Sequence, residues 1–355
     1  MGPTGLDIKH EGRRFALTAD DMMEISRQAE AAGFESLWTN EDIGFDAFSV
    51  LSAMSQHTAR IKLGTAIVNV YNRSAMQLAM AAATLDELSG GRAILGLSIG
   101  HHPWNDLGHG IPMDKPLARL REYVEFLRHA ISGHPFTHDG PIFRGVESQL
   151  AFDPIRPRLP VFIAGERPRM IELAGELADG RLINVVSPEY IAAVAAERLR
   201  SSARAAGRDA DALELTALVT CSVSENEDAG LAAAQAMVAH RLRQSLKMLD
   251  TQPAHRHDEI RSVHAVMQAG EKERAAAMVS EELARSLVVF GRPNQISAGL
   301  NAYFAAGCTR VIAVAYPRSR DAVDRLCSAL APSLQYYAKR NEYAPVGTCS
   351  PMVDR

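Results

Sequence analysis

Short apolar or β-branched runs alternate with segments of helical period along most of this 355-residue chain. Runs of four to eight such residues are typical of buried strands, and apolar residues that recur every three or four positions are typical of amphipathic helices. Repeated βα units of this kind build a parallel sheet. The sequence predicts eight strands, at residues 5–10, 36–40, 61–68, 93–98, 160–164, 181–186, 213–222 and 310–315.

The predicted helices lie between these strands and carry recognisable end signals. Thr18 precedes two acidic residues as an N-cap, and Gly33 follows the same helix as its stop. Pro168 stands in the first turn of another helix, where a missing N–H costs little. The expected helices cover residues 19–32, 47–56, 75–88, 117–131, 167–177, 188–206, a long stretch within 229–285, and 294–306.

Eight such units predict a (β/α)8 TIM-type barrel with inserted loops and helices. No Gly-x-Gly-x-x-Gly follows the first strand, so a dinucleotide-binding fold is disfavoured. Although this length could hold two domains, barrels of this kind also reach it as one. We expect one domain over residues 1–340, with insertions near 99–116, 132–159 and 225–285, and a C-terminal tail over 341–355.

The charge balance and the cysteines restrict the class of partner. There are 38 Lys+Arg against 42 Asp+Glu, which disfavours nucleic acid or a membrane surface and favours a small-molecule substrate. The four cysteines are widely spaced, and no third ligand stands at recognisable spacing from the adjacent His101 and His102, so neither a disulfide framework nor a metal site is expected. No signal-peptide core or spanning segment is evident, and we expect a cytoplasmic protein.

Active sites of such barrels lie at the carboxyl ends of the strands, so the residues there are candidates. Asp7 lies in the first strand; if it faces the interior, loss of solvent raises its pKa and suits it to acid–base work. Glu41 and Asp42 follow the second strand and could protonate or polarise a ligand. In each case the alternative is structural: a partner for a buried cation, or a solvated turn.

Two further candidates follow later strands. His101, His102 and Trp104 open the long loop after the fourth strand, where an imidazole can titrate near neutrality and an indole can stack on a planar ligand. Residues 165–169, Gly-Glu-Arg-Pro-Arg, lead into a helix whose free N–H groups and arginines could bind a phosphate. Either stretch could equally be an ordinary surface loop.

Several local sequences together carry a family resemblance. Residues 61–69 read Ile-Lys-Leu-Gly-Thr-Ala-Ile-Val-Asn, residues 84–92 read Thr-Leu-Asp-Glu-Leu-Ser-Gly-Gly-Arg, and residues 178–184 read Ala-Asp-Gly-Arg-Leu-Ile-Asn. In this order, over most of residues 5–315, the chain resembles the bacterial luciferase-like superfamily of flavin and deazaflavin oxidoreductases. Within it, the chain is most similar to the branch of F420-dependent methylenetetrahydromethanopterin reductases.

The resemblance implies a usually dimeric barrel that holds F420, or alternatively FMN, at the carboxyl ends of its strands. It also implies a cis peptide at Ala66–Ile67 behind the ring and a phosphate contact at Gly165 and Glu166. We therefore expect catalytic roles for Asp7, Glu41 and His101 and substrate contacts from Asp42, His102 and Trp104. The expected cofactor-binding residues are Asn40, Ala66, Ile67, Asn69, Ser98, Gly100, Gly165, Glu166, Arg167 and Ser187.

Two positions depart from the family pattern. Relatives often have an acid followed by histidine after the second strand, where this chain has Glu41-Asp42, and deazaflavin enzymes usually have an acid where this chain has His101. Both lie where substrate should meet the ring, so the pterin substrate is not carried over. The sequence leaves three hypotheses: an F420-dependent oxidoreductase that transfers a hydride to or from a small substrate, an FMN-dependent monooxygenase, or a cofactor-free binding or accessory protein.

Overall fold

The strands of this protein close into a parallel barrel, which confirms the predicted fold class. A computed structural model describes residues 1–7, 17–41, 44–100, 104–244 and 246–342. Neighbouring barrel strands are parallel, and the cycle closes where the last strand pairs with the first. In barrel order the strands are β1 (Thr4–Asp7), β2 (Ser36–Thr39), β3 (Lys62–Thr65), β5 (Ala93–Ser98), β8 (Val161–Ala164), β9 (Gly180–Asn184), β10 (Glu214–Val223) and β12 (Arg310–Ala315). The short β4 (Val68–Asn69) also pairs with β5.

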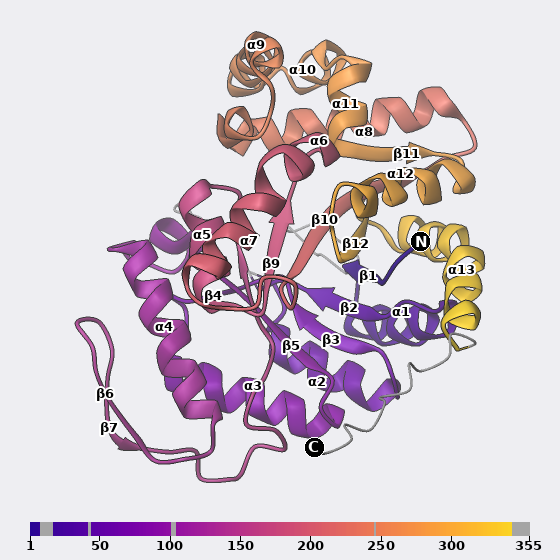
Figure 1. Cartoon of the computed structure of the whole chain (residues 1–355). Helices are drawn as coiled ribbons and strands as arrows, with labels where there is room; N and C mark the ends of the chain where they lie inside the picture. The colour runs from indigo at the N-terminus through magenta and orange to yellow at the C-terminus, as the bar shows by residue number, and fades with distance from the viewer. Residues whose placement is uncertain (8–16, 42–43, 101–103, 245, 343–355) are drawn as a thin grey trace, which may run out of the picture.

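Helices surround the barrel, and their bounds agree closely with the expected ones (Figure 1). The first helix shows why: Thr18 and Asp21 form a reciprocal capping box, and Gly33 in the left-handed region closes the other end. The helices around the barrel are α1 (Ala19–Ala32), α2 (Ala47–His57), α3 (Ala75–Ser89), α4 (Pro116–Ile131), α5 (Pro168–Leu177), the continuous α6 (Pro188–Tyr190), η2 (Ile191–Ala195) and α7 (Ala196–Ala205), then α12 (Pro293–Ala305) and α13 (Arg320–Glu342). The last of these was not among the predicted helices.

The predicted long helical stretch is a helical insertion above the barrel (Figure 1). It packs around its own buried apolar cluster, which includes Val238, Leu242 and Ile260. Its elements are α8 (Glu227–Gln244), η3 (Leu246–Asp250), η4 (Ala254–Arg256), α9 (His257–Gln268), α10 (Lys272–Met278) and α11 (Glu281–Leu287).

A strand that was not predicted, β11 (Val288–Gly291), follows this insertion. It pairs with Thr220–Val223 of β10, beyond the point where β9 stops at Asn184. Because β12 already occupies the opposite edge of Thr220, β11 takes the edge that β9 leaves free. The extra strand therefore depends on the ten-residue length of β10 and not on a signal of its own.

A β-hairpin was also missed, within residues 132–159, which were expected to be a loop. Strands β6 (Phe136–Asp139) and β7 (Arg144–Ser148) pair antiparallel and project beside α4 (Figure 1). Phe136 and Phe143 pack against Phe126 of α4, with ring centroids 5.0 and 6.5 Å apart. Packing against the helix thus orders a segment whose composition is typical of a loop. In the other long loop, Trp104–Gly108 forms a π-helical turn (η1).

The barrel interior is filled by large side chains at mid-height. The Trp38 and Phe162 rings lie 6.0 Å apart, and Leu182, Leu218 and Ile312 complete the layer. A Cβ on Gly64 would lie 2.2 Å from the Trp38 ring, so the indole requires a glycine opposite it. The middle of the barrel is therefore a packed core, and space for a ligand has to be sought at its ends.

The amino-terminal end of the barrel is closed by charged groups. Arg310, whose side chain is 4% exposed, forms ion pairs with Glu35 at 3.0 Å and Glu214 at 2.8 Å. At the same end, Asp179, just before β9, accepts hydrogen bonds from the Arg128 side chain, at 2.9 Å, and from the N–H of Val161 at the start of β8. These contacts tie the lower ends of the strands to the surrounding helices.

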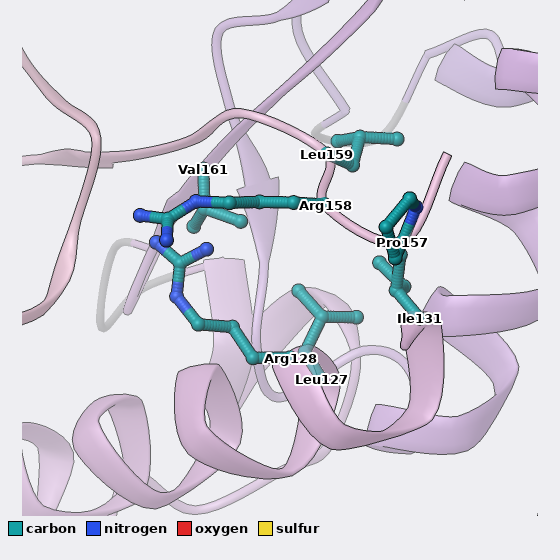
Figure 2. A pocket seen from close by; sticks show the side chains of 7 residues that line it. All are labelled: Leu127, Arg128, Ile131, Pro157, Arg158, Leu159 and Val161. Carbon is teal, nitrogen blue, oxygen red and sulfur yellow. The ribbon is translucent and has the colours of Figure 1, made fainter. Parts of the chain in front are cut away.

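A cavity of about 160 Å³ lies at this lower end, between α4 and the segment before β8. Figure 2 shows the guanidinium groups of Arg128 and Arg158 side by side at its edge. Both bind Asp179, and although burial acts in the opposite direction, these cations hold the pKa of the Asp179 carboxyl below its ordinary value. The two arginines are thus engaged in closing the barrel.

None of the helices in the described ranges is both long and apolar enough to cross a membrane.

Replacing Arg310 with Met should destabilise the fold. It leaves two carboxylates without their shared cation at a largely buried position, and we expect a loss of about 2 to 4 kcal/mol in the free energy of unfolding. Arg261→Met is the control, because the Arg261–Asp258 pair is exposed and should contribute less than about 1 kcal/mol. Urea denaturation of both variants measures the difference, and equal small losses would contradict the role given to Arg310.

Candidate functional site

The carboxyl ends of the barrel strands carry a ring of mainly small or polar side chains. Inward and outward positions alternate along each strand, and the interior residues Trp38, Leu182 and Leu218 fix which positions face inward. Above the packed layer the inward positions are Asp7, Asn40, Ala66, Ser98, Ala164, Asn184, Thr220 and Val314. The barrel therefore changes from a filled core to a polar mouth within one layer of side chains.

Asp7 and Asn40 stand on adjacent strands at this mouth. A Cβ on Gly5 would meet Trp38 in the interior, so Asp7, two residues further along, faces the same way. Asp7 is 2% exposed and Asn40 is 8% exposed. A carboxylate held in so buried a position can exchange protons or hydrogen bonds with a ligand that enters the mouth.

Beyond Asn40 the mouth continues with small side chains. Ala66 directly follows β3, Ser98 and Ala164 end the next strands β5 and β8, and the Ser98 hydroxyl donates to the Ala164 carbonyl at 3.0 Å. The Ala66–Ile67 peptide is cis, as the resemblance implied. Three short side chains in a row would obstruct a flat group at the strand ends less than larger side chains would.

Glu41 is bound to neighbouring helices. Its two carboxylate oxygens accept hydrogen bonds from Arg73 at 3.0 and 2.9 Å, and one also accepts from the Ala47 N–H at the start of α2. Arg73 contacts Asp46 as well, and the hydrogen bonds from Arg73 to Glu41 raise the pKa of Arg73. The structure therefore gives Glu41 a positioning role beside the mouth, and its catalytic role stays a prediction.

Asn69 and Gly100 belong to the structural frame of the loop after β5. The Asn69 amide bonds to the Asn105 side chain and accepts from the Tyr71 N–H at 3.0 Å. Gly100, with φ 68°, lies directly against the same amide. Asn105 in turn donates to the Ile99 carbonyl at 3.0 Å, so these residues hold the loop in place. The cofactor contacts expected of Asn69 and Gly100 stay predictions.

The segments after β8 and β9 meet at one side of the mouth. Gly165 adopts a φ of 138°, and the chain turns through Glu166 and Arg167 into α5. The Tyr190 hydroxyl donates to the Glu166 carbonyl at 3.2 Å, and Ser187 caps α6 through its side chain. Two helical segments thus begin side by side here, which is the arrangement expected of a phosphate site.

Val185, just after β9, has the unusual φ of 55°. This left-handed conformation is sterically unfavourable for a β-branched residue and costs about 1 to 3 kcal/mol. Val185 also packs against the apolar cluster of the insertion. The strained residue therefore links the mouth to the insertion above it.

Other predicted residues fall partly outside this geometry. Asp42, His101 and His102 lie outside the described residues, and the backbone of Trp104 begins the π-helical turn. Arg167 extends toward the insertion, where its side chain lies 4.0 Å from Asp250. The roles proposed for these residues stay predictions.

Sequence reasoning left out several residues that shape the site, notably Arg73, Thr220 and Val185. Thr220 could have been found by following the inward alternation along β10, and Arg73 by asking which cation faces Glu41. A strained φ at Val185 leaves no mark in the sequence, because the local residues are ordinary strand residues.

Comparison with known proteins supports a common origin over nearly the whole barrel. A family model described as luciferase-like monooxygenase matches residues 5–310. The chain is 31% identical to a 5,10-methylenetetrahydromethanopterin reductase of Archaeoglobus fulgidus over 80% of this chain and 86% of that protein. It is 29% identical to a putative coenzyme F420-dependent oxidoreductase of Mycobacterium tuberculosis, over 82% and 90%.

The fold is also found among solved structures. The coenzyme F420-dependent tetrahydromethanopterin reductase of Methanopyrus kandleri superimposes with a TM-score of 0.81 and 24% identity, covering 94% of this chain and 99% of that one. At this sequence identity, the structural match by itself shows only a shared fold. Together with the sequence matches, it confirms the family resemblance.

The strain at Val185 predicts an unequal response to glycine at two adjacent positions. In Val185→Gly the relief of strain offsets the lost packing, so unfolding free energy should change by less than about 1 kcal/mol. Val186→Gly removes a buried side chain without such relief and should cost about 2 to 4 kcal/mol. Chemical denaturation of the pair measures this contrast, which equal losses would contradict.

Proposed function

The chain belongs to the luciferase-like monooxygenase family, and on that premise we propose that it is an F420-dependent oxidoreductase acting on a small organic substrate. The observation that carries the proposal is the mouth itself: short side chains just after β3 and at the ends of β5 and β8 continue the rim from Asp7 and Asn40, and Ala164 lies on the strand opposite β1. F420 is favoured over FMN by the names of similar proteins, which include a putative coenzyme F420-dependent oxidoreductase and methylenetetrahydromethanopterin reductases, one of them described as coenzyme F420-dependent.

The described residues fit a planar cofactor with a phosphate-bearing tail. Ala66, Ser98 and Ala164 have short side chains where the ring would lie, while the turn at Gly165 and the cap at Ser187 bring two helix starts together for the phosphate. When bound, a deazaflavin supplies hydride transfer at C5, and the protein supplies binding, orientation and electrostatics.

Asp7 is the residue that we propose for proton transfer at the substrate. It is buried at the mouth, on the side that faces the small residues. Glu41, the second candidate, already binds Arg73 with both oxygens, so it is better suited to hold the start of α2 in place. His101 remains a candidate from the sequence.

We also propose that the protein forms a homodimer through α2 and α3. These helices pack side by side, α2 contains no Asp, Glu, Lys or Arg, and Glu87 is the exposed charge of α3, whose buried Asp86 is paired with Arg156. Met80 is 52% exposed and Leu88 is 48% exposed on α3. Solvent-facing helix surfaces normally carry charges, so a surface of this composition supports a contact with a second copy.

A cytoplasmic location is proposed as well. The thiols of Cys221, Cys308 and Cys327 are free and buried, and burial raises the pKa of Cys221 to about 12. Such thiols are unreactive and fit a reducing compartment.

The cofactor proposal is tested by titrating purified protein with F420 and with FMN while following fluorescence. We expect micromolar binding of F420. Tight binding of FMN alone would favour a flavin-dependent monooxygenase instead, and binding of neither would favour a non-catalytic protein. In both cases the proposed function would be wrong.

A bulkier side chain at Ala164 should obstruct the ring. Ala164→Leu fills part of the small-residue side of the mouth, and an overpacking cost of 1 to 3 kcal/mol corresponds to a loss of about tenfold or more in cofactor affinity. Ala232→Leu, on an exposed face of α8, is the matched control and should bind normally. Unchanged affinity in Ala164→Leu, with its thermal stability retained, would place the ring elsewhere.

The dimer proposal predicts that one charge on α3 separates the subunits. Met80→Glu would bury two carboxylates in a symmetric contact and should give a monomer in light scattering coupled to size exclusion. Met278→Glu, on the exposed end of α10, serves as the control and should leave the wild-type mass unchanged. A monomeric wild type, or a dimeric Met80→Glu variant, would contradict this interface.

A further inference from the structure

Arg181, in β9, is an arginine without solvent contact on the outer face of the barrel. It is 0% exposed, and it points away from the interior because its neighbour Leu182 belongs to the interior cluster. Its Nη1 donates to the Ile163 carbonyl at 2.9 Å, while Nε and Nη2 have no hydrogen-bond partner within the described part of the chain. Buried guanidinium donors are costly unless an acceptor satisfies them.

The position of Arg181 is just below the two helix starts at the mouth. Ile163, which it bonds and with which it is in register, is two residues before Gly165. The charged or ionisable groups that act on the guanidinium are Glu166 and Tyr190, one from each of the two segments. The Tyr190 hydroxyl joins these segments through the Glu166 carbonyl.

The cation persists at neutral pH. Burial lowers the pKa of Arg181 to about 10, against the opposing effect of Glu166, so the group stays protonated under physiological conditions. In the described structure Glu166 is not within ion-pair distance, and Arg167 and Arg169 nearby are exposed. An excess of positive charge is therefore held beneath the segment that leads into α5.

We propose that Arg181 is the buried cation of an anion site formed by residues 165–169 and Ser187, and that it makes binding there selective for a phosphate group. The inference rests on the proposed function, because the phosphate is that of the cofactor. The site combines the free N–H groups at the start of α5 with a charge that water does not screen. Arg181 is thus a positioning and selectivity residue and takes no part in the chemical step.

Substitution of Arg181 separates this role from a purely structural one. Arg181→Met keeps much of the volume and removes a buried charge, so thermal stability should be equal to wild type or higher. Its affinity for F420 should fall about tenfold or more, because one charge-assisted contact to the phosphate is lost. Affinity for the phosphate-free deazaflavin core of F420 should stay unchanged, and Arg181→Lys should recover part of the preference for the phosphate.

The control is Arg208→Met. Arg208 donates to the carbonyls of Gly175 and Ala178 at the far end of α5, so this variant should lose stability and keep the wild-type preference for the phosphate-bearing molecule. If Arg181→Met instead loses stability while its phosphate preference is unchanged, Arg181 is structural and the proposal is wrong.

A second measurement does not depend on the cofactor. Inorganic phosphate at millimolar concentration should raise the melting temperature of the wild type and of Arg208→Met, but not that of Arg181→Met. Equal shifts in all three proteins, or no shift in the wild type, would overturn the anion site even if F420 binds. Conversely, a shift that requires Arg181 would support the site even if neither F420 nor FMN binds and the proposed function fails.

Discussion

A closed barrel of eight parallel strands admits only every second side chain to its interior, and this constraint determines where a ligand can bind. The admitted side chains fill the middle: Trp38 and Phe162 pack together, and Gly64 is small because the indole occupies its space. Below them, Arg310 closes the barrel through Glu35 and Glu214. Only the upper layer, with Asp7 on one side and Ala66, Ser98 and Ala164 on the other, is left for chemistry.

The segments around this mouth are fixed by buried polar contacts that do not face the mouth directly. Glu41 and Arg73 join the segment after β2 to the start of α3, and Asn69 and Asn105 hold the loop after β5. Val185 adds a strained backbone that packs against the insertion. Such supports reduce the freedom of the residues that would touch a ligand, which is the general requirement for precise orientation.

Much of this could be predicted from local sequence, because the signals themselves are local. The period of the apolar residues, the Thr18–Asp21 box and Gly33 define α1 without help from the rest of the chain. By contrast, β11 forms because β10 extends beyond the end of β9 and offers a free edge. The β6–β7 hairpin is held in place because Phe136 and Phe143 pack against Phe126. Those contacts join distant segments, so neither element was predicted.

The site shows the same division. Asp7 was recognisable as an acidic residue within the first predicted strand, and the turn at Gly165 because it leads into a helix with Pro168. Arg181 looked like the first residue of an apolar strand, and only the packing of α5 over β9 shows that its charge is buried. Burial of a charge by segments far apart in sequence has no local pattern.

A crystal structure of the protein with F420 bound tests the central claim most directly. The account predicts that the deazaflavin ring lies across Ala66, Ser98 and Ala164 at the carboxyl ends of the strands, with one face toward Asp7. Density for the ring at another surface, or a bound ring whose open face is turned away from Asp7, would contradict it.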